Sequence, residues 1–192
     1  MRNQYLLIVT LSILMAACGT KYKNPHVEIQ TKFGDIEVEL YPDQAPKTVA
    51  NFLAIIKKGS YNNSTFYRVL NDENQPSNAP KAELIQGGIH YTSKAVISGL
   101  AHETTQQTGI LHKRGTISMA RLEPGSAGSE FFICLADQPG FDFGGENNPD
   151  KQGYAAFGKV IKGMDIVNKI YNQSEENQLF DPQIPIYNII QL

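Results

Sequence analysis

Apolar and polar residues alternate along much of this chain, which is the pattern of β-strands with one buried face. The clearest example is the segment 35–41, in which Glu37 and Glu39 alternate with apolar residues. Because successive side chains of a strand point to opposite faces, this segment is predicted to be half buried, with Gly34 at the turn of a hairpin from a strand over 27–31. The two glutamates could form an acid–base pair, but a solvated strand face explains them more simply. We therefore expect both to be exposed.

Two short apolar strands joined by a polar loop lie at the centre of the chain, between Gly115 and Leu135. Phe131 and Phe132 are neighbours in the second of these strands, so they point to opposite faces. Further segments of strand length occur at 65–70, 84–89, 154–161 and 184–192. We expect Phe131 to lie in the core and Phe132 to be free to line a surface pocket, where the function is expected.

Two segments carry the spacing of helices instead. In 46–59, proline stands near the start, apolar residues recur at helical spacing, and Gly59 ends the pattern. A second helix is predicted over 162–171, and the polar segment 71–83 is predicted to be a surface loop. Strands outnumber helices and no regular alternation of strand and helix occurs. The sequence therefore favours one mainly β domain over 27–192, a closed antiparallel barrel capped by two α-helices.

Charge and the reactive side chains narrow the function. The net charge of −2 gives no electrostatic footprint for nucleic acid or for an anionic membrane surface. His90, His102 and His112 have no spacing typical of a zinc site, so they are expected at the surface. Cys134 stands among apolar residues, which predicts a buried side chain without a nucleophilic role.

The N-terminal segment has the pattern of a secretory signal peptide. Residues 1–17 combine Arg2, an apolar run too short to span a bilayer comfortably, and small residues before Cys18. The position of the cysteine resembles a bacterial lipoprotein signal, although Met15 stands where such signals usually have leucine. The resemblance implies cleavage before Cys18, acylation of its thiol, and a tether over 18–26 that holds the domain to a membrane. An ordinary signal peptide with an incidental cysteine is the alternative.

Five short motifs occur together in a fixed order. They are Phe66–Val69 (FYRV), Ile85–Gly88 (IQGG), Gly115–Ala120 (GTISMA), Gly128–Ile133 (GSEFFI) and Phe157–Val160 (FGKV). This set resembles the signature segments of the cyclophilin family of peptidyl-prolyl isomerases, over roughly residues 27–192. The resemblance implies an eight-stranded antiparallel barrel whose interior is filled by side chains. The active site would then lie in a groove on the outside.

The same resemblance implies the residues of the site. Arg68 matches the family's catalytic arginine, which would donate a hydrogen bond to the prolyl nitrogen as the amide twists, and Gln86 would orient it. Phe132 would form the floor of an apolar pocket for the proline ring. The other substrate-binding positions are Leu84, Met119, Ala120, Arg121, Glu130, Phe141 and Tyr154, with the backbone of Arg121 pairing with substrate. No metal and no cofactor are required.

Three positions depart from the family's pattern. Glu130 stands where glutamine is usual, and an ionised carboxylate accepts hydrogen bonds but cannot donate them. Glu83 stands where an aromatic residue is typical, and Gly140 falls near the place of a tryptophan that many members carry. We therefore expect a shifted substrate preference and weak binding of cyclosporin, the family's usual inhibitor.

The predicted function is prolyl isomerisation that assists the folding of exported proteins, with proline-containing polypeptides as clients. The enzyme is expected to be a monomer, anchored in the cell envelope through Cys18 and facing the periplasm. Two alternatives remain at this stage. One is a groove that binds proline-containing segments with little turnover, suggested by Glu130 and Glu83. The other is a lipoprotein whose barrel is only a scaffold.

Overall fold

The computed structural model describes residues 22–89 and 99–192. The predicted signal peptide, the predicted lipidation site Cys18, the start of the predicted tether and His90 lie outside these residues.

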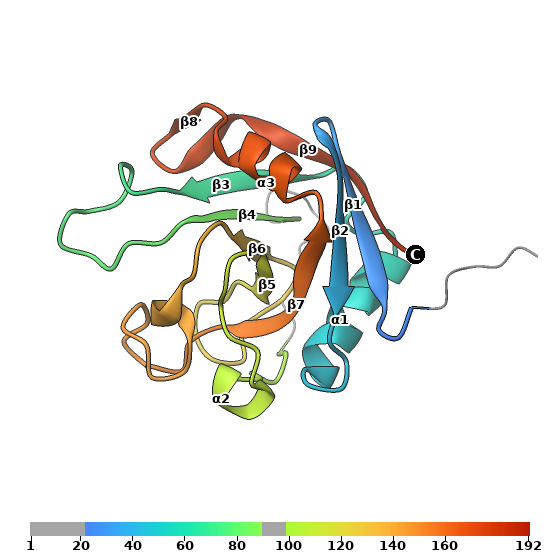
Figure 1. Cartoon of the computed structure of the whole chain (residues 1–192), viewed down its shortest axis with the longest axis horizontal. Helices are drawn as coiled ribbons and strands as arrows, with labels where there is room; N and C mark the ends of the chain where they lie inside the picture. The colour runs from blue at the N-terminus through green and yellow to red at the C-terminus, as the bar shows by residue number, and fades with distance from the viewer. Residues whose placement is uncertain (1–21, 90–98) are drawn as a thin grey trace, which may run out of the picture.

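Eight strands of the described chain close into an antiparallel barrel, which confirms the predicted fold class (Figure 1). In bonding order they are β1 (His26–Thr31), β2 (Gly34–Leu40), β7 (Ala155–Lys162), β5 (Thr116–Met119), β6 (Phe131–Cys134), β4 (Leu84–Gly88), β3 (Ser64–Leu70) and β9 (Leu179–Gln191). β1 pairs with β9 as well as with β2, so the sheet closes on itself. The two-residue strand β8 (Glu175–Glu176) pairs with the start of β9 in a small hairpin.

Large apolar side chains fill the interior of the barrel. Phe131 is fully buried there, and its ring meets the rings of Phe52, Tyr61 and Phe66 edge-on, at centroid distances of 5.7, 5.8 and 5.8 Å. Edge-to-face contacts are a favourable arrangement of aromatic rings, and their burial removes much apolar surface from water. Since side chains occupy the interior, a ligand must bind on the outside of the barrel.

The two predicted helices are α1 (Pro46–Lys57) and α3 (Met164–Tyr171), which lie at opposite ends of the barrel (Figure 1). Each turns an apolar face to the core, through residues such as Phe52 of α1 and Val167 of α3. The described chain also contains two short helical turns that the sequence did not predict, α2 (Thr105–Thr108) and a 3-10 turn over Pro139–Phe141.

A distant carboxylate caps the first turn of α1. The side chain of Ala45, the residue before the helix, cannot cap it, and Glu103 does so instead. Its carboxylate accepts hydrogen bonds from the backbone N–H of Lys47 at 3.1 Å, the backbone N–H of Thr48 at 2.8 Å and the hydroxyl of Thr48 at 2.7 Å. The positive end of the helix dipole favours a negative charge at this place. Glu103 therefore ties the segment before α2 to the start of α1.

Glu37 corrects one prediction, because its side chain is buried on the outer face of β2 with an exposed fraction of 8%. Its carboxylate accepts hydrogen bonds from His26 Nδ1 at 2.8 Å and Lys162 Nζ at 2.6 Å, on the two neighbouring strands. These bonds, first that of Lys162 and then that of His26, lower the pKa of the Glu37 carboxyl. Strand alternation identified the outer face but not the side chains that cover it. Glu39, on the same face, is partly exposed.

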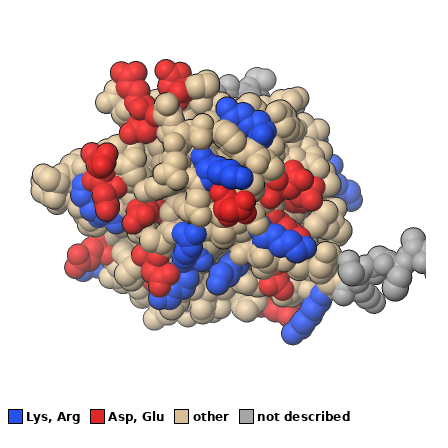
Figure 2. Space-filling model, turned by 45° about the horizontal axis from the view of Figure 1, so that its top comes forward, with Lys and Arg blue, Asp and Glu red and all other residues tan. Residues whose placement is uncertain are grey.

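The outer surface carries mixed charge. Figure 2 shows basic and acidic side chains interspersed on one face, with neither sign gathered into a large patch. Among residues 22–89 and 99–192, no helix has both the length and the apolar character needed to cross a bilayer.

Replacing Phe131 by alanine should destabilise the fold strongly, because it leaves a cavity where three rings meet. We expect the free energy of unfolding to fall by about 3–5 kcal/mol, as for other large-to-small changes in packed cores. Urea denaturation measures this loss. The control is Phe143→Ala, which truncates a ring that is 44% exposed and should change stability by less than about 1 kcal/mol. Similar, small losses for the two variants would contradict a filled interior.

Candidate active site

A groove of about 370 Å³ lies on the outside of the barrel, over β3, β4 and β6. It brings together seven of the predicted site residues in addition to Arg68: Leu84, Gln86, Ala120, Arg121, Phe132, Phe141 and Tyr154. The loop between β3 and β4 contributes Gln75, Pro76 and Ala79 to the same groove. Two predicted residues, Met119 and Glu130, are not part of its lining.

The floor of the groove is aromatic. Phe132 packs edge-on against Phe141 and Tyr154, with ring centroids 5.4 and 5.3 Å away. Together with Leu84 and Cys134, it belongs to an apolar cluster outside the barrel that is separate from the main core. Burial raises the pKa of the Cys134 thiol, which therefore stays protonated and acts as an apolar side chain. Phe131 faces inward and Phe132 faces this cluster, as strand alternation requires.

A bulge in β3 directs Arg68 to the outside. The pairing register of β3 shifts between Phe66 and Arg68, on the sides of both β4 and β9. Phe66 and Val69 belong to the main core, so the two residues between them, Tyr67 and Arg68, both lie off it. An extra residue of this kind redirects a side chain, and bulges are frequent next to active sites.

Arg68, Gln86 and Phe132 form one row across three strands. Arg68 is opposite Gln86 in the pairing of β3 with β4, and Gln86 is opposite Phe132 in the pairing of β4 with β6. Arg68 Nη1 donates a hydrogen bond to Gln86 Oε1 at 3.3 Å, and Gln86 Nε2 donates to the hydroxyl of Tyr67 at 2.7 Å. Directly opposite residues are nearest neighbours in a sheet. The row therefore places Arg68 and Phe132 on either side of Gln86, and all three residues line the groove.

Gln178 is a contact of Arg68 that the sequence did not predict. Its Oε1 accepts hydrogen bonds from Arg68 Nη2 at 2.6 Å and from Arg68 Nε at 3.2 Å. Gln178 lies in the turn between β8 and β9, 110 positions from Arg68. No local pattern links residues so far apart, so only the folded chain reveals the pair.

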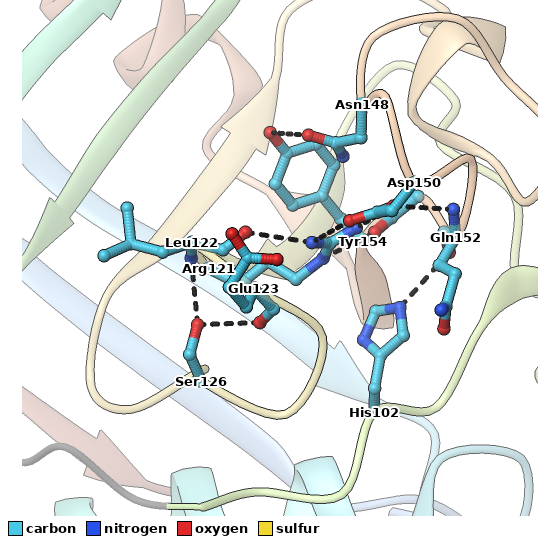
Figure 3. A network of polar contacts seen from close by, with 10 residues as sticks. His102, Arg121, Leu122, Glu123, Ser126, Asn148, Asp150, Gln152 and Tyr154 are labelled. Atoms are coloured by element: carbon cyan, nitrogen blue, oxygen red, sulfur yellow. Dashed lines mark hydrogen bonds and ion pairs between the residues drawn. The ribbon is translucent and has the colours of Figure 1, made fainter.

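The wall formed by Tyr154 rests on the ion pair of Arg121 with Asp150 (Figure 3). Arg121 has a side chain only 1% exposed, and its two terminal nitrogens donate to the two carboxylate oxygens of Asp150, each at 2.8 Å. Its guanidinium carbon also lies 5.4 Å from the centre of the Tyr154 ring, and Arg121 Nε donates to the carbonyl of Gly153. The hydrogen bonds from Arg121 lower the pKa of the Asp150 carboxyl. The arginine therefore fixes the wall, and its neighbour Leu122 is 88% exposed at the rim.

Two predicted site residues lie away from the groove. Met119 is opposite Phe131 in the pairing of β5 with β6 and is fully buried in the main core, which corrects its expected place as a pocket wall. The Glu130 carboxylate lies against Gly88 instead of lining the groove. Its Oε1 accepts hydrogen bonds from the backbone N–H of Ile89 at 3.0 Å and from the hydroxyl of Ser129 at 2.9 Å.

Glu83 also lies outside the groove lining. It is close to Tyr171 of α3, whose pKa is raised to about 12, first by burial and then by the negative charge of Glu83. The next residue back, Ala82, is buried in the outer cluster with Leu84 and Phe132. Three residues of the loop before Glu83, namely Gln75, Pro76 and Ala79, line the groove.

His112 corrects the expectation of a surface histidine, because it is buried under the floor, with an exposed fraction of 1%. Its ring stacks below Phe132 with centroids 6.0 Å apart. The Asp142 carboxylate accepts a hydrogen bond from His112 Nδ1 at 2.8 Å, and His112 Nε2 is hydrogen-bonded to the hydroxyl of Ser118 at 2.9 Å. This is the order of a catalytic triad, but Ser118 is fully buried and cannot meet a substrate. The three residues therefore support the floor.

His102 is half buried and bonds the carbonyl of Gln152 at 3.2 Å, and burial lowers its pKa. Among the residues that the structure describes, no three histidine, cysteine, aspartate or glutamate side chains gather as a metal site would require.

The groove combines an apolar floor with an oriented guanidinium. Such a site can bind a small apolar ring and donate hydrogen bonds to an atom next to it.

This chain is similar to known proteins in sequence and in structure. The family model for "Cyclophilin type peptidyl-prolyl cis-trans isomerase/CLD" matches residues 26–190. The peptidyl-prolyl cis-trans isomerase of Acinetobacter baylyi is 40% identical over 150 residues, which cover 78% of this chain and 73% of that protein. Peptidyl-prolyl cis-trans isomerase B of Escherichia coli is 34% identical over 168 residues, 85% of this chain and 94% of that protein. A Cryptosporidium parvum cyclophilin-type isomerase, crystallised in the presence of the dipeptide Ala-Pro, superposes with a TM-score of 0.67 at 28% identity, covering 86% of this chain and 97% of that one.

Replacing His112 by leucine should destabilise the protein, because it leaves the Ser118 hydroxyl and the Asp142 carboxylate without their buried partner. An unpaired buried polar group costs about 1–3 kcal/mol, so chemical denaturation should show a loss of at least that size. The matched control is His102→Leu, which removes one longer hydrogen bond from a half-buried ring and should have a smaller effect. Equal stability of His112→Leu and the unchanged protein would contradict the supporting role of His112.

Proposed function

Because the chain belongs to the cyclophilin-type peptidyl-prolyl cis-trans isomerase family, we propose that its outer groove is the active site and that Arg68 is the catalytic residue. The protein is a peptidyl-prolyl cis-trans isomerase, so it accelerates rotation about X–Pro bonds. The observation that carries the assignment of the site is the row formed by Arg68, Gln86 and Phe132 across β3, β4 and β6.

The chemistry follows from the electronic structure of the X–Pro amide. Partial double-bond character gives rotation a barrier of about 18–20 kcal/mol. When the bond twists, the lone pair of the prolyl nitrogen no longer delocalises and can accept a hydrogen bond. A donor aimed at this nitrogen binds the twisted amide better than either planar isomer, which is what catalysis requires. Arg68 is that donor in our proposal.

The contacts of Arg68 leave it able to donate. A guanidinium carries five N–H groups. Three of them are engaged, one with Gln86 and two with Gln178. One N–H on each terminal nitrogen is left for a substrate, and Arg68 lines the groove.

The remaining groove residues have roles that fit a proline-containing chain. Phe132 offers the floor on which a proline ring can pack, with Leu84, Phe141 and Tyr154 around it. Ala120 and Arg121 border the groove where the substrate backbone would pass, and the buried side chain of Arg121 leaves its backbone as the part that can pair. The C. parvum relative was crystallised in the presence of Ala-Pro, which supports proline-containing polypeptides as the substrates here.

We infer further that the enzyme is an exported lipoprotein that assists folding in the cell envelope. The pattern of residues 1–17 and the position of Cys18 support this inference. Acyl chains on Cys18 would anchor the domain, and residues 18–26 would act as a tether. The proposed protein is a monomer that faces the periplasm, where exported chains arrive unfolded and slow prolyl isomerisation delays their folding.

Replacing Arg68 by alanine should lower isomerase activity by about 100-fold or more, the usual effect of removing a donor aimed at a transition state. The measurement is the acceleration of a proline-limited refolding reaction, with stability checked by denaturation. Arg114→Ala, which removes an exposed arginine outside the groove, is the matched control and should keep the original rate. Full activity of Arg68→Ala would exclude Arg68 as the catalytic residue.

Replacing Cys18 by alanine should abolish incorporation of a radioactive fatty acid when the protein is produced in a bacterial host. The full chain with Cys18 should be labelled and should sediment with membranes, and Cys134→Ala is the control that removes the other cysteine. Because Cys134 is buried, its loss should leave the label in place. An unlabelled full chain would refute the lipoprotein proposal and leave the isomerase assignment untouched.

A further inference from the structure

Gln178 occupies a turn position that suits glycine better. Glu176 pairs with Leu179, so the β8–β9 hairpin has a two-residue loop of Asn177 and Gln178. Both have positive φ, 53° and 71°. Two-residue loops of this conformation favour asparagine followed by glycine, because a side chain at positive φ is strained. A glutamine at the second place needs another explanation than the turn itself.

The explanation lies in the contacts of Gln178, because all four of its polar groups are engaged. The side-chain Oε1 accepts from Arg68 Nη2 and Nε, and Nε2 donates to the carbonyl of Asn74 at 3.0 Å. The backbone N–H donates to the Glu175 carboxylate at 2.7 Å, and the backbone carbonyl accepts from the N–H of Val69 at 2.9 Å. Three hydrogen bonds, two from the backbone and one from the side chain, therefore hold Gln178 in place apart from its contacts with Arg68.

Gln178 and Gln86 hold Arg68 from opposite ends of its guanidinium. Gln86 accepts from Nη1, and Gln178 accepts from Nη2 and Nε. These bonds fix the plane of the group and leave one N–H on each terminal nitrogen for other partners. Both acceptors are neutral amides, so the positive charge is not cancelled as it would be by a carboxylate.

Gln178 also connects Arg68 to the loop between β3 and β4. Asn74, which accepts from Gln178 Nε2, donates from its own side chain to the carbonyl of Val69 at 3.1 Å. The next two residues, Gln75 and Pro76, border the groove. Figure 1 shows this loop and the β8–β9 turn projecting from the same side of the barrel. The arginine, the loop and the turn thus meet at one glutamine.

We propose that Gln178 is a positioning residue that orients the guanidinium of Arg68 for isomerisation, at the expense of a less favourable turn. The proposal rests on the catalytic role proposed for Arg68. Gln178 acts through Arg68 and through the β3–β4 loop. Its replacement should therefore lower kcat more than it raises KM.

Replacing Gln178 by glycine tests this proposal, because glycine relieves the turn while it removes the contact. The Gln178→Gly protein should be at least as stable as the original. Its kcat should fall by about 10- to 100-fold, the size expected for a misplaced catalytic group, with KM little changed. NMR exchange measurements on a proline-containing peptide separate kcat from KM. The Nε–H signal of Arg68 should exchange faster with water in this variant.

Asn177→Gly is the matched control. It relieves the neighbouring residue of the same turn, whose side chain is exposed and lies outside the groove lining. It should keep the original kcat and the original Nε–H exchange. In an Arg68→Lys background, Gln178→Gly should have little further effect, because lysine has no Nε–H to be held.

The outcomes separate this proposal from the one on which it rests. Full activity of Arg68→Ala would refute the catalytic role of Arg68. Loss of activity in Arg68→Ala together with an unchanged kcat in Gln178→Gly would refute the positioning role alone. A fall in stability that parallels the fall in activity, or a raised KM with an unchanged kcat, would also overturn it, because the role would then be structural or direct binding.

Discussion

The alternation of side chains in a closed, filled barrel is the constraint on which the site depends. Once the interior is packed with rings such as Phe131, each strand can offer only its outward residues to a ligand. β4 and β6 obey simple alternation, which places Gln86 and Phe132 in one outward row. β3 reaches that row only through its bulge, which sends Arg68 outward while Phe66 and Val69 stay in the core. The site is thus a consequence of register as much as of residue type.

The floor and one wall of the groove are supported by polar side chains packed against their aromatic rings. His112 lies beneath Phe132 and is held by Asp142 and Ser118. Arg121, paired with Asp150, lies against Tyr154. Buried polar groups are expensive unless every partner is in place, so such supports have one good geometry. Both supports therefore help to fix the positions of Phe132 and Tyr154.

Periodic features were predictable from the sequence, and contacts between distant segments were not. The strand and helix segments, and the opposite orientations of Phe131 and Phe132, follow from spacing along the chain. Met119 was misplaced because its position relative to Phe131 depends on the register of β5 with β6. His112 and Glu37 were expected at the surface, since nothing local reveals the side chains that cover them. Gln178 could not be found at all, because a turn residue carries no periodic signal and its partner is far away in the chain.

Loop residues form part of the groove wall in this chain. Glu83 lies near α3, and residues of the β3–β4 loop, Pro76 and Ala79, take up the wall beside Phe132. This loop is bonded to Gln178, and through it to Arg68. A polypeptide bound along the groove would therefore contact a loop that hydrogen bonds connect, through Gln178, to the guanidinium of Arg68. Because this loop is held by hydrogen bonds, its shape depends on Asn74 and Gln178 together. Gln178 thus joins two parts of the groove, the Arg68 guanidinium and the β3–β4 loop, that lie far apart in the sequence.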